Sequence, residues 1–191
     1  KLEKADMQPS VSATRREWLR RVTFDLTGLP PTQSEIASFL SDTSANPKVA
    51  VVDRLLASPA YGERWARHWL DLVRYGETDG HEFDADKVGP YHYRDYVIRA
   101  FNRDVPYNQF VTEQIAGDLM KTPRINPETH WNESAIGTAF FWLGERVHSP
   151  VDLQDNEAER IDNQLDVLGK TFFGLSLGCA RCHNHKFDPI S

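Results

Sequence analysis

Apolar residues recur at helical spacing along nearly the whole chain, and prolines divide them into separate segments. Proline fits the first turn of a helix and disrupts its interior, so Asn46-Pro47 and Ser58-Pro59 indicate helix starts. Gly28-Leu29-Pro30-Pro31 marks the end of an earlier helix. Alternation with a period of two, which is typical of half-buried strands, is scarce. The sequence therefore predicts an all-α fold.

The predicted helices are separated by two long polar loops. The apolar pattern predicts helices over 18–26, 32–40, 47–56, 59–73, 93–102, 106–120, 134–143 and 154–175. In the last of these, Ile161, Leu165 and Leu168 share one predicted apolar face, together with Phe172 and Leu175. The segments 75–90 and 121–131 are rich in glycine, acidic or other polar residues and are expected to be ordered loops. The overall expectation is an irregular helical domain with long loops.

The ends of the chain and its charge set limits on its organisation and partners. Residues 1–13 precede the first helical pattern and are expected to be a flexible segment, with a single helical domain over 14–191. The start at Lys1 and the stop at Ser191 favour a piece of a longer protein with further domains. The 22 Lys and Arg against 28 Asp and Glu, a net charge of −6, offer no footprint for nucleic acid and favour a basic partner. No apolar run is long enough for a membrane span.

Both cysteines of the chain lie in the segment Cys179-Ala180-Arg181-Cys182-His183. Cys-X-X-Cys-His is the attachment signature of c-type haem. Residues three and four apart share one face of a helical turn, so both thiols can reach the two vinyl groups on one porphyrin edge. The imidazole of His183 would then bind the iron from the proximal side. This spacing therefore predicts one covalently bound haem.

Three other roles for the two cysteines stay open. A redox dithiol of the Cys-X-X-Cys type is typical of a βαβ context, which this helical sequence lacks. A zinc site could use His183 and His185 together with Cys179 and Cys182, although such closely spaced ligands strain a tetrahedral cage. A structural disulfide between Cys179 and Cys182 is the third alternative. In the second and third cases the domain would be a binding module without haem.

Several sequence blocks resemble a known protein family. They are Arg67-His68-Trp69-Leu70-Asp71, the run from Tyr93 to Asn102, Gln114-Ile115-Ala116-Gly117-Asp118-Leu119 and the closing run from Leu175 to Ile190. Together they resemble the planctomycete cytochrome-type family long described as a domain of unknown function. The resemblance covers most of 14–191 and implies a c-type haem domain in exported proteins, next to a smaller cytochrome-like domain and another uncharacterised one. It implies no particular reaction. Asn184 departs from the family, where a carboxylate is usual.

The second axial position of a haem iron decides between electron transfer and ligand binding. The side chains considered for it are Met7, His68, His81, His92, Met120, His130, His148 and His185. We expect His148 as the distal ligand, because it lies in a loop before Pro150 that could fold over a cofactor. His81 is the alternative, since Glu82 beside it could orient the imidazole. An open or water-ligated iron remains the third option.

Charged residues near the motif and in the first long loop suggest secondary roles. Arg181 and Lys186 flank the motif and are expected at the haem edge, where they could screen the propionates. The loop residues Glu77, Asp79, Glu82, Asp84 and Asp86 could supply oxygen ligands to a calcium ion, although a solvated acidic loop is the simpler interpretation.

The sequence as a whole favours a c-type cytochrome domain that transfers electrons in an exported, periplasmic multidomain protein. The haem attachment chemistry itself takes place outside the cytoplasm, which agrees with this location. A small, transient interface with a redox partner protein is expected. A haem-dependent oxidoreductase or a ligand-binding domain with an open iron is the alternative, and electron transfer is favoured over catalysis by this domain alone.

Overall fold

The computed structural model describes residues 2–190, and these residues contain helices and no β-strand, which confirms the predicted all-α fold. None of the helices in the described part of the chain is both long and apolar enough to span a membrane. The chain divides into two compact units, Lys1–Trp65 and Ala66–Ser191. The expected single domain over 14–191 stays a prediction, as does the flexibility of 1–13.

The first unit is a small helical arrangement. It consists of the short 3-10 turn η1 (Glu3–Ala5), α1 (Arg15–Thr27), α2 (Gln33–Ser41), α3 (Pro47–Leu56) and the first half of α4 (Pro59–Leu72). Thr32 and Glu35 form a capping box at the start of α2, as the sequence predicts. Asn46 precedes Pro47 at the start of α3, but its side chain makes no capping hydrogen bond. The buried apolar residues are Leu19, Phe39, Val51 and Leu55.

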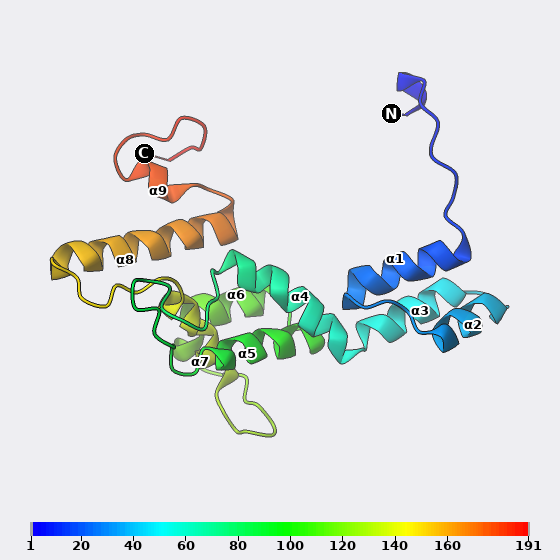
Figure 1. Cartoon of the computed structure of the whole chain (residues 1–191), viewed down its shortest axis with the longest axis horizontal. Coiled ribbons are helices and arrows are strands. Elements are labelled where there is room, and N and C mark those ends of the chain that lie inside the picture. Colours follow the sequence, from blue (N-terminus) through cyan, green and yellow to red (C-terminus); the bar gives the residue numbers. More distant parts are fainter. Residues whose placement is uncertain (1, 191) are drawn as a thin grey trace. The chain divides into compact units, whose positions relative to one another are not determined.

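The second unit contains the remaining helices (Figure 1). They are the end of α4, α5 (Tyr91–Asn102), α6 (Tyr107–Ala116), η2 (Gly117–Leu119), α7 (Glu133–Gly137), η3 (Thr138–Trp142), α8 (Leu153–Leu168), η4 (Gly169–Phe173) and α9 (Leu177–Ala180). Two of the predicted helices change to 3-10 geometry part of the way along. The predicted helix 106–120 changes to a 3-10 turn at Gly117, and 134–143 is half α-helix and half 3-10 helix.

Aromatic residues form the core of the second unit. Trp69 meets Phe110 edge to face with ring centroids 4.8 Å apart, and Tyr96 stacks on Phe110 at 6.1 Å. The indole Nε1 of Trp69 donates a hydrogen bond to the Tyr93 hydroxyl at 2.9 Å. Such pairs add to the free energy gained by burying the rings. This core brings the end of α4, α5 and α6 together, and α8 packs on its outside.

The predicted apolar face of the last long helix does not form as expected. Ile161 and Leu165 are 44% and 51% exposed, whereas Leu168 and Phe172 pack partly buried against the core. After Leu168 a π-helical turn, η4, replaces the end of the predicted helix and changes the spacing of the residues that follow. Among the described residues 151–190, only Gly169 is buried. The C-terminal segment therefore has no apolar core of its own.

Candidate functional site

The Cys-X-X-Cys-His motif lies at the end of α9 and in the turn that follows it. Cys179 belongs to the last turn of α9, and Cys182 and His183 come after it. Both cysteines are exposed, and neither forms a disulfide. His183 is exposed as well. The three side chains that could bind a haem are therefore accessible together.

The core-facing side of α8 fixes this helix on the second unit. Arg74 Nε donates to the side-chain oxygen of Asn163 at 2.7 Å, and Gln164 Nε2 donates to the backbone carbonyl of Phe141 at 2.6 Å. Val167 also packs against the core. These contacts define the inner side of α8.

The opposite side of α8 carries the motif. Each residue turns an α-helix by about 100°, so Asp162, Asp166 and Gly169 lie roughly opposite the core-facing residues. Asp166 Oδ1 accepts a hydrogen bond from the backbone N–H of Gly178 at 2.9 Å. A Cβ atom on Gly169 would lie 2.5 Å from Leu177, so α9 can pack this closely only against a glycine. In Figure 1, α9 and the C-terminal loop accordingly lie on the outer side of α8.

The imidazole of His183 is oriented by the backbone beside it. Its Nδ1 lies 2.9 Å from the carbonyl oxygen of Asn184. A carbonyl only accepts hydrogen bonds, so Nδ1 carries the proton and Nε2 keeps a free lone pair. This is the arrangement that suits a metal-binding histidine. It uses the backbone carbonyl of Asn184, so it does not depend on the side chain at this position.

His185 is held in the other tautomer. Its Nδ1 accepts backbone hydrogen bonds from Phe187 at 3.1 Å and from Asp188 at 2.7 Å, and therefore carries no proton. Asp188 Oδ2 lies 3.7 Å from the same nitrogen. We assign Nδ1 as an acceptor because two N–H groups point at it. The ring nitrogen nearest to the backbone is thus occupied, and His185 is not arranged as a ligand beside His183.

The zinc alternative stays a prediction. The described residues bring together no group of three or more His, Cys, Asp or Glu side chains that could hold a metal ion. This includes the set Cys179, Cys182, His183 and His185. The motif is therefore arranged as two free thiols and one oriented imidazole.

Residues 1–191 match the sequence model of a family described as "Protein of unknown function (DUF1549)", with the short name PSCyt2. The chain belongs to this family. No curated protein matches it, and no solved structure does. The family name hints at a cytochrome-like domain and defines no activity.

The two expected distal ligands of this PSCyt2 chain lie in neighbouring loops. The ring of His148 packs on Phe83 with centroids 4.7 Å apart, and Arg146 N donates to the carbonyl of Asp79 at 3.0 Å. The Nδ1 atom of His81 is buried without a hydrogen-bond partner among the described residues. In Figure 1 these loops lie on the inner side of α8, and the motif lies on its outer side. The two loops thus contact each other, through Phe83 with His148 and through Arg146 with Asp79.

The charged residues expected at the haem edge have partners or stacking contacts of their own. Arg181 forms an ion pair with Asp162 at 3.3 Å. The ammonium group of Lys186 lies 5.2 Å from the centre of the Phe187 ring, close enough for a cation–π interaction. Both residues lie beside the motif, and their role toward propionates stays a prediction.

The acidic loop is held mainly by its own contacts. Glu77 pairs with Arg94 at 2.7 Å, and Asp79 pairs with Lys87 at 3.5 Å. Asp84 Oδ1 accepts a hydrogen bond from the N–H of Gly80. Three of the five carboxylates thus have protein partners. A calcium ion in this loop stays a prediction.

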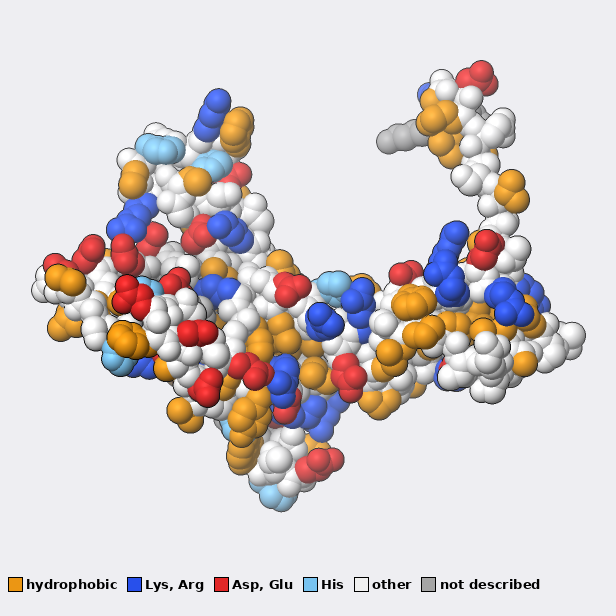
Figure 2. All heavy atoms as spheres, viewed as in Figure 1, with side chains coloured by type: hydrophobic (Ala, Val, Ile, Leu, Met, Phe, Trp, Pro, Cys, Tyr) orange, Lys and Arg blue, Asp and Glu red, His pale blue; other side chains and the backbone are white. Residues whose placement is uncertain are grey.

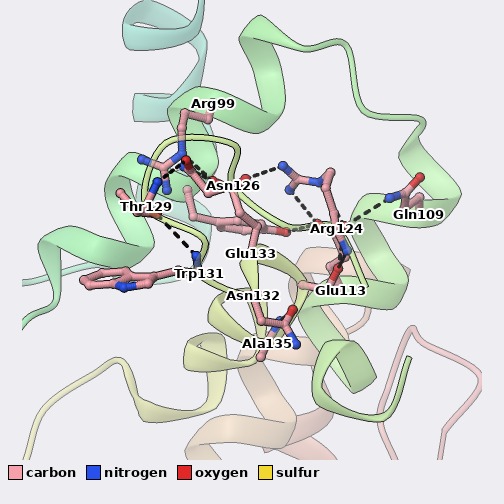
Figure 3. A network of polar contacts seen from close by, with 12 residues as sticks. Arg99, Gln109, Glu113, Arg124, Asn126, Thr129, Trp131, Asn132, Glu133 and Ala135 are labelled. Carbon is pink, nitrogen blue, oxygen red and sulfur yellow. Dashed lines mark hydrogen bonds and ion pairs between the residues drawn. The ribbon is translucent and has the colours of Figure 1, made fainter. Parts of the chain in front are cut away.

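A buried polar network, which the sequence analysis did not predict, lies in the second unit (Figure 3). Glu113 and Glu133 have no exposed surface, and Arg124 pairs with both. Arg99 Nε donates to Glu133 Oε1 at 2.5 Å, and Asn126 Nδ2 donates to the same oxygen at 2.8 Å. Figure 3 shows these side chains pointing toward one another from the α5–α7 region.

The network is arranged for structure rather than for chemistry. Burial alone raises the pKa of Glu113, but hydrogen bonds from Arg124, Tyr96 and Gln109 and the charge of Arg124 outweigh it, so this pKa lies below its ordinary value. A carboxylate that stays charged and fully bonded is a poor proton donor or acceptor. One signal in the sequence could have indicated that Glu113 is buried. Glu113 follows Phe110 by three residues and so lies on the apolar face of α6.

Proposed function

We propose that this domain carries one c-type haem, bound through thioethers to Cys179 and Cys182 with His183 as the axial ligand, and that it transfers electrons in an exported multidomain protein. The observation that carries the proposal is the arrangement of the motif. Two free, exposed thiols lie beside an imidazole whose Nε2 lone pair is available. The chain has no other cysteine.

The surroundings of the motif suit a large apolar group. Phe187, four residues after His183, is 82% exposed. Figure 2 shows hydrophobic, histidine and basic side chains at the surface of the C-terminal segment. Exposed apolar side chains around a reactive group are typical of a surface that another group covers. The porphyrin face supplies such a cover, so the residues present fit the cofactor.

The haem, when bound, supplies one-electron exchange at its iron. The protein positions the haem and orients the histidine that binds its iron. Cys179 and Cys182 fix the position of the ring, and the carbonyl of Asn184 holds the tautomer in which His183 can bind iron. Arg181 and Lys186 place positive charge beside the motif. The net charge of −6 favours a partner with a basic surface, met over a small interface.

One observation favours a second candidate function. In Figure 1, the loops that carry the two expected distal histidines lie on the other side of α8 from the motif. An iron with one protein ligand binds small molecules, as the alternative of an open or water-ligated site predicts. A haem domain that senses or reacts with a small ligand is therefore the second proposal.

Expression in a bacterial host that exports the protein and attaches haem tests both proposals. We expect an intact mass larger than that of the polypeptide by one haem and a visible cytochrome spectrum. His183→Ala should change the spectrum strongly, whereas His185→Ala should not. Carbon monoxide should shift the spectrum of the reduced protein if the iron is open. A mass equal to that of the polypeptide alone would refute the haem assignment.

A further inference from the structure

Few contacts hold the motif in place, so each of them contributes strongly to its position. Among the described residues after Val151, Gly169 alone is buried, so hydrophobic packing does little to fix the position of α9. Two carboxylates accept hydrogen bonds from the backbone just before Cys179. They are the side chains of Asp166 and Asp188.

Asp166 holds the residue next to the first cysteine. Its Oδ1 accepts the Gly178 N–H at 2.9 Å, and its Oδ2 is paired with Lys170 at 2.5 Å. A Cβ atom on residue 178 would lie 3.0 Å from Asp166 Oδ1, so the absence of a side chain there permits the close approach. Asp166 thus ties Gly178, and with it Cys179, to the outer side of α8.

Asp188 joins the two ends of the motif segment. Its Oδ2 accepts the Ser176 N–H at 2.8 Å, and its own N–H donates to His185 Nδ1 at 2.7 Å. The side chain therefore closes a loop from Ser176 to Asp188 that contains both cysteines and His183. The backbone of the same residue keeps Nδ1 of His185 occupied.

We propose that Asp166 and Asp188 are positioning residues for haem attachment: they fix the loop so that Cys179, Cys182 and His183 face outward together. Asp188 has a second role, which is to hold His185 in a conformation that does not compete with His183 for the iron. This inference rests on the proposed function. It assigns to the two carboxylates a role that acts through the cysteines and the histidine, without contact with the iron.

Substitutions that remove or keep the acceptor oxygen test the proposal. In the exporting host, Asp166→Leu and Asp188→Leu should each lower the fraction of chains that carry haem, by on the order of tenfold, as for other residues that support metal ligands. Asp166→Asn and Asp188→Asn keep an oxygen acceptor and should retain most of the attachment. The matched control is Glu157→Leu, which also removes a paired carboxylate from α8 but one whose partner, Arg160, lies on the same helix.

Three measurements separate positioning from folding and from the haem assignment itself. Intact mass gives the fraction attached, circular dichroism gives the helix content, and the visible spectrum reports the axial ligand. Asp188→Leu keeps the backbone N–H that donates to His185 Nδ1, so the haem that remains attached should keep the wild-type spectrum. Wild-type protein with haem, together with fully loaded leucine variants, would overturn this inference alone. Wild-type protein without haem would overturn the proposed function, and this inference with it. A loss of helix content equal to the loss of haem would show a folding role instead.

Discussion

Arg124 meets the buried carboxylate of Glu113 through two parallel hydrogen bonds, Nε to Oε1 at 3.1 Å and Nη2 to Oε2 at 2.8 Å. Glu113 has no exposed surface. Removing the guanidinium would leave this buried carboxylate without its positively charged partner, and such a loss costs about 3–5 kcal/mol. We expect Arg124→Leu to lower the free energy of unfolding by this amount in urea titrations.

The control for this variant is Arg160→Leu, which breaks the Glu157–Arg160 pair on the surface of α8. Exposed pairs contribute about 0–1 kcal/mol, so this change should be nearly neutral. Equal unfolding free energies for the two leucine variants would contradict a stabilising role for the buried pair.

The stability of the protein should fall in acid because of Glu113. Its pKa is lower in the folded protein than its ordinary value of 4.5, because the bonds to Arg124 and Tyr96 outweigh the effect of burial. A carboxyl with a depressed pKa contributes stability above its unfolded pKa, and this contribution is lost as the pH falls through the folded pKa. The loss should therefore begin near pH 4.5 and continue below it.

Urea unfolding from pH 7 to pH 3 measures this dependence. Glu113→Gln has no carboxyl to protonate at this position, so its stability should change less over the same range. If the wild-type protein and this variant lose stability in parallel, the acid sensitivity has another source.

Tyr93 connects two buried polar groups. Its hydroxyl accepts from Trp69 Nε1 at 2.9 Å and donates to Gln114 Oε1 at 2.5 Å. Tyr93→Phe would leave both groups buried and unsatisfied, at a cost of about 1–3 kcal/mol for each such loss. Thermal unfolding should show a lower Tm, whereas Tyr107→Phe, at an exposed position of α6, should leave Tm unchanged.

Gly117 is needed where η2 crosses the start of α7. A Cβ atom there would lie 1.7 Å from the carbonyl oxygen of Ser134, so the backbone has to move to accept any side chain. Overpacking of this kind costs about 1–3 kcal/mol or more. Gly117→Ala should reduce the yield of folded protein and its Tm. Gly76→Ala, whose nearest neighbour would be 3.7 Å away, should be tolerated, and a harmless Gly117→Ala would contradict the close packing.

Local signals in the sequence predict the helix starts well. The capping box of Thr32 and Glu35 and the prolines at 47 and 59 act within one turn of chain, so their effect does not depend on the rest of the fold. The end of α8 is different. The π-helical turn after Leu168 accompanies the close packing of Leu177 on Gly169, a contact between residues in separate elements that periodicity does not contain.

The candidate site likewise has one part that the sequence predicts and another that it does not. The motif itself is a local pattern, so the sequence identifies Cys179, Cys182 and His183. The positions of His81 and His148 depend on how their loops fold. Contacts between residues far apart in the sequence, such as the hydrogen bond from Arg146 N to Asp79 O, determine this folding. The charged partner of Glu113 comes from outside its helix, so the place of Glu113 on the apolar face of α6 indicates burial without naming Arg124.

The bonds around Asn126 have a consequence for the motion of the loop 121–131. Asn126 is buried, its N–H donates to Trp131 O, and its Oδ1 accepts two backbone N–H groups. Arg124, in the same loop, is locked to both buried glutamates. Opening the loop alone would break all of these bonds at once, so its protected amides should exchange with deuterium about as slowly as those of the aromatic core. A connection of this length would then behave as part of the rigid interior and open only when the whole unit unfolds.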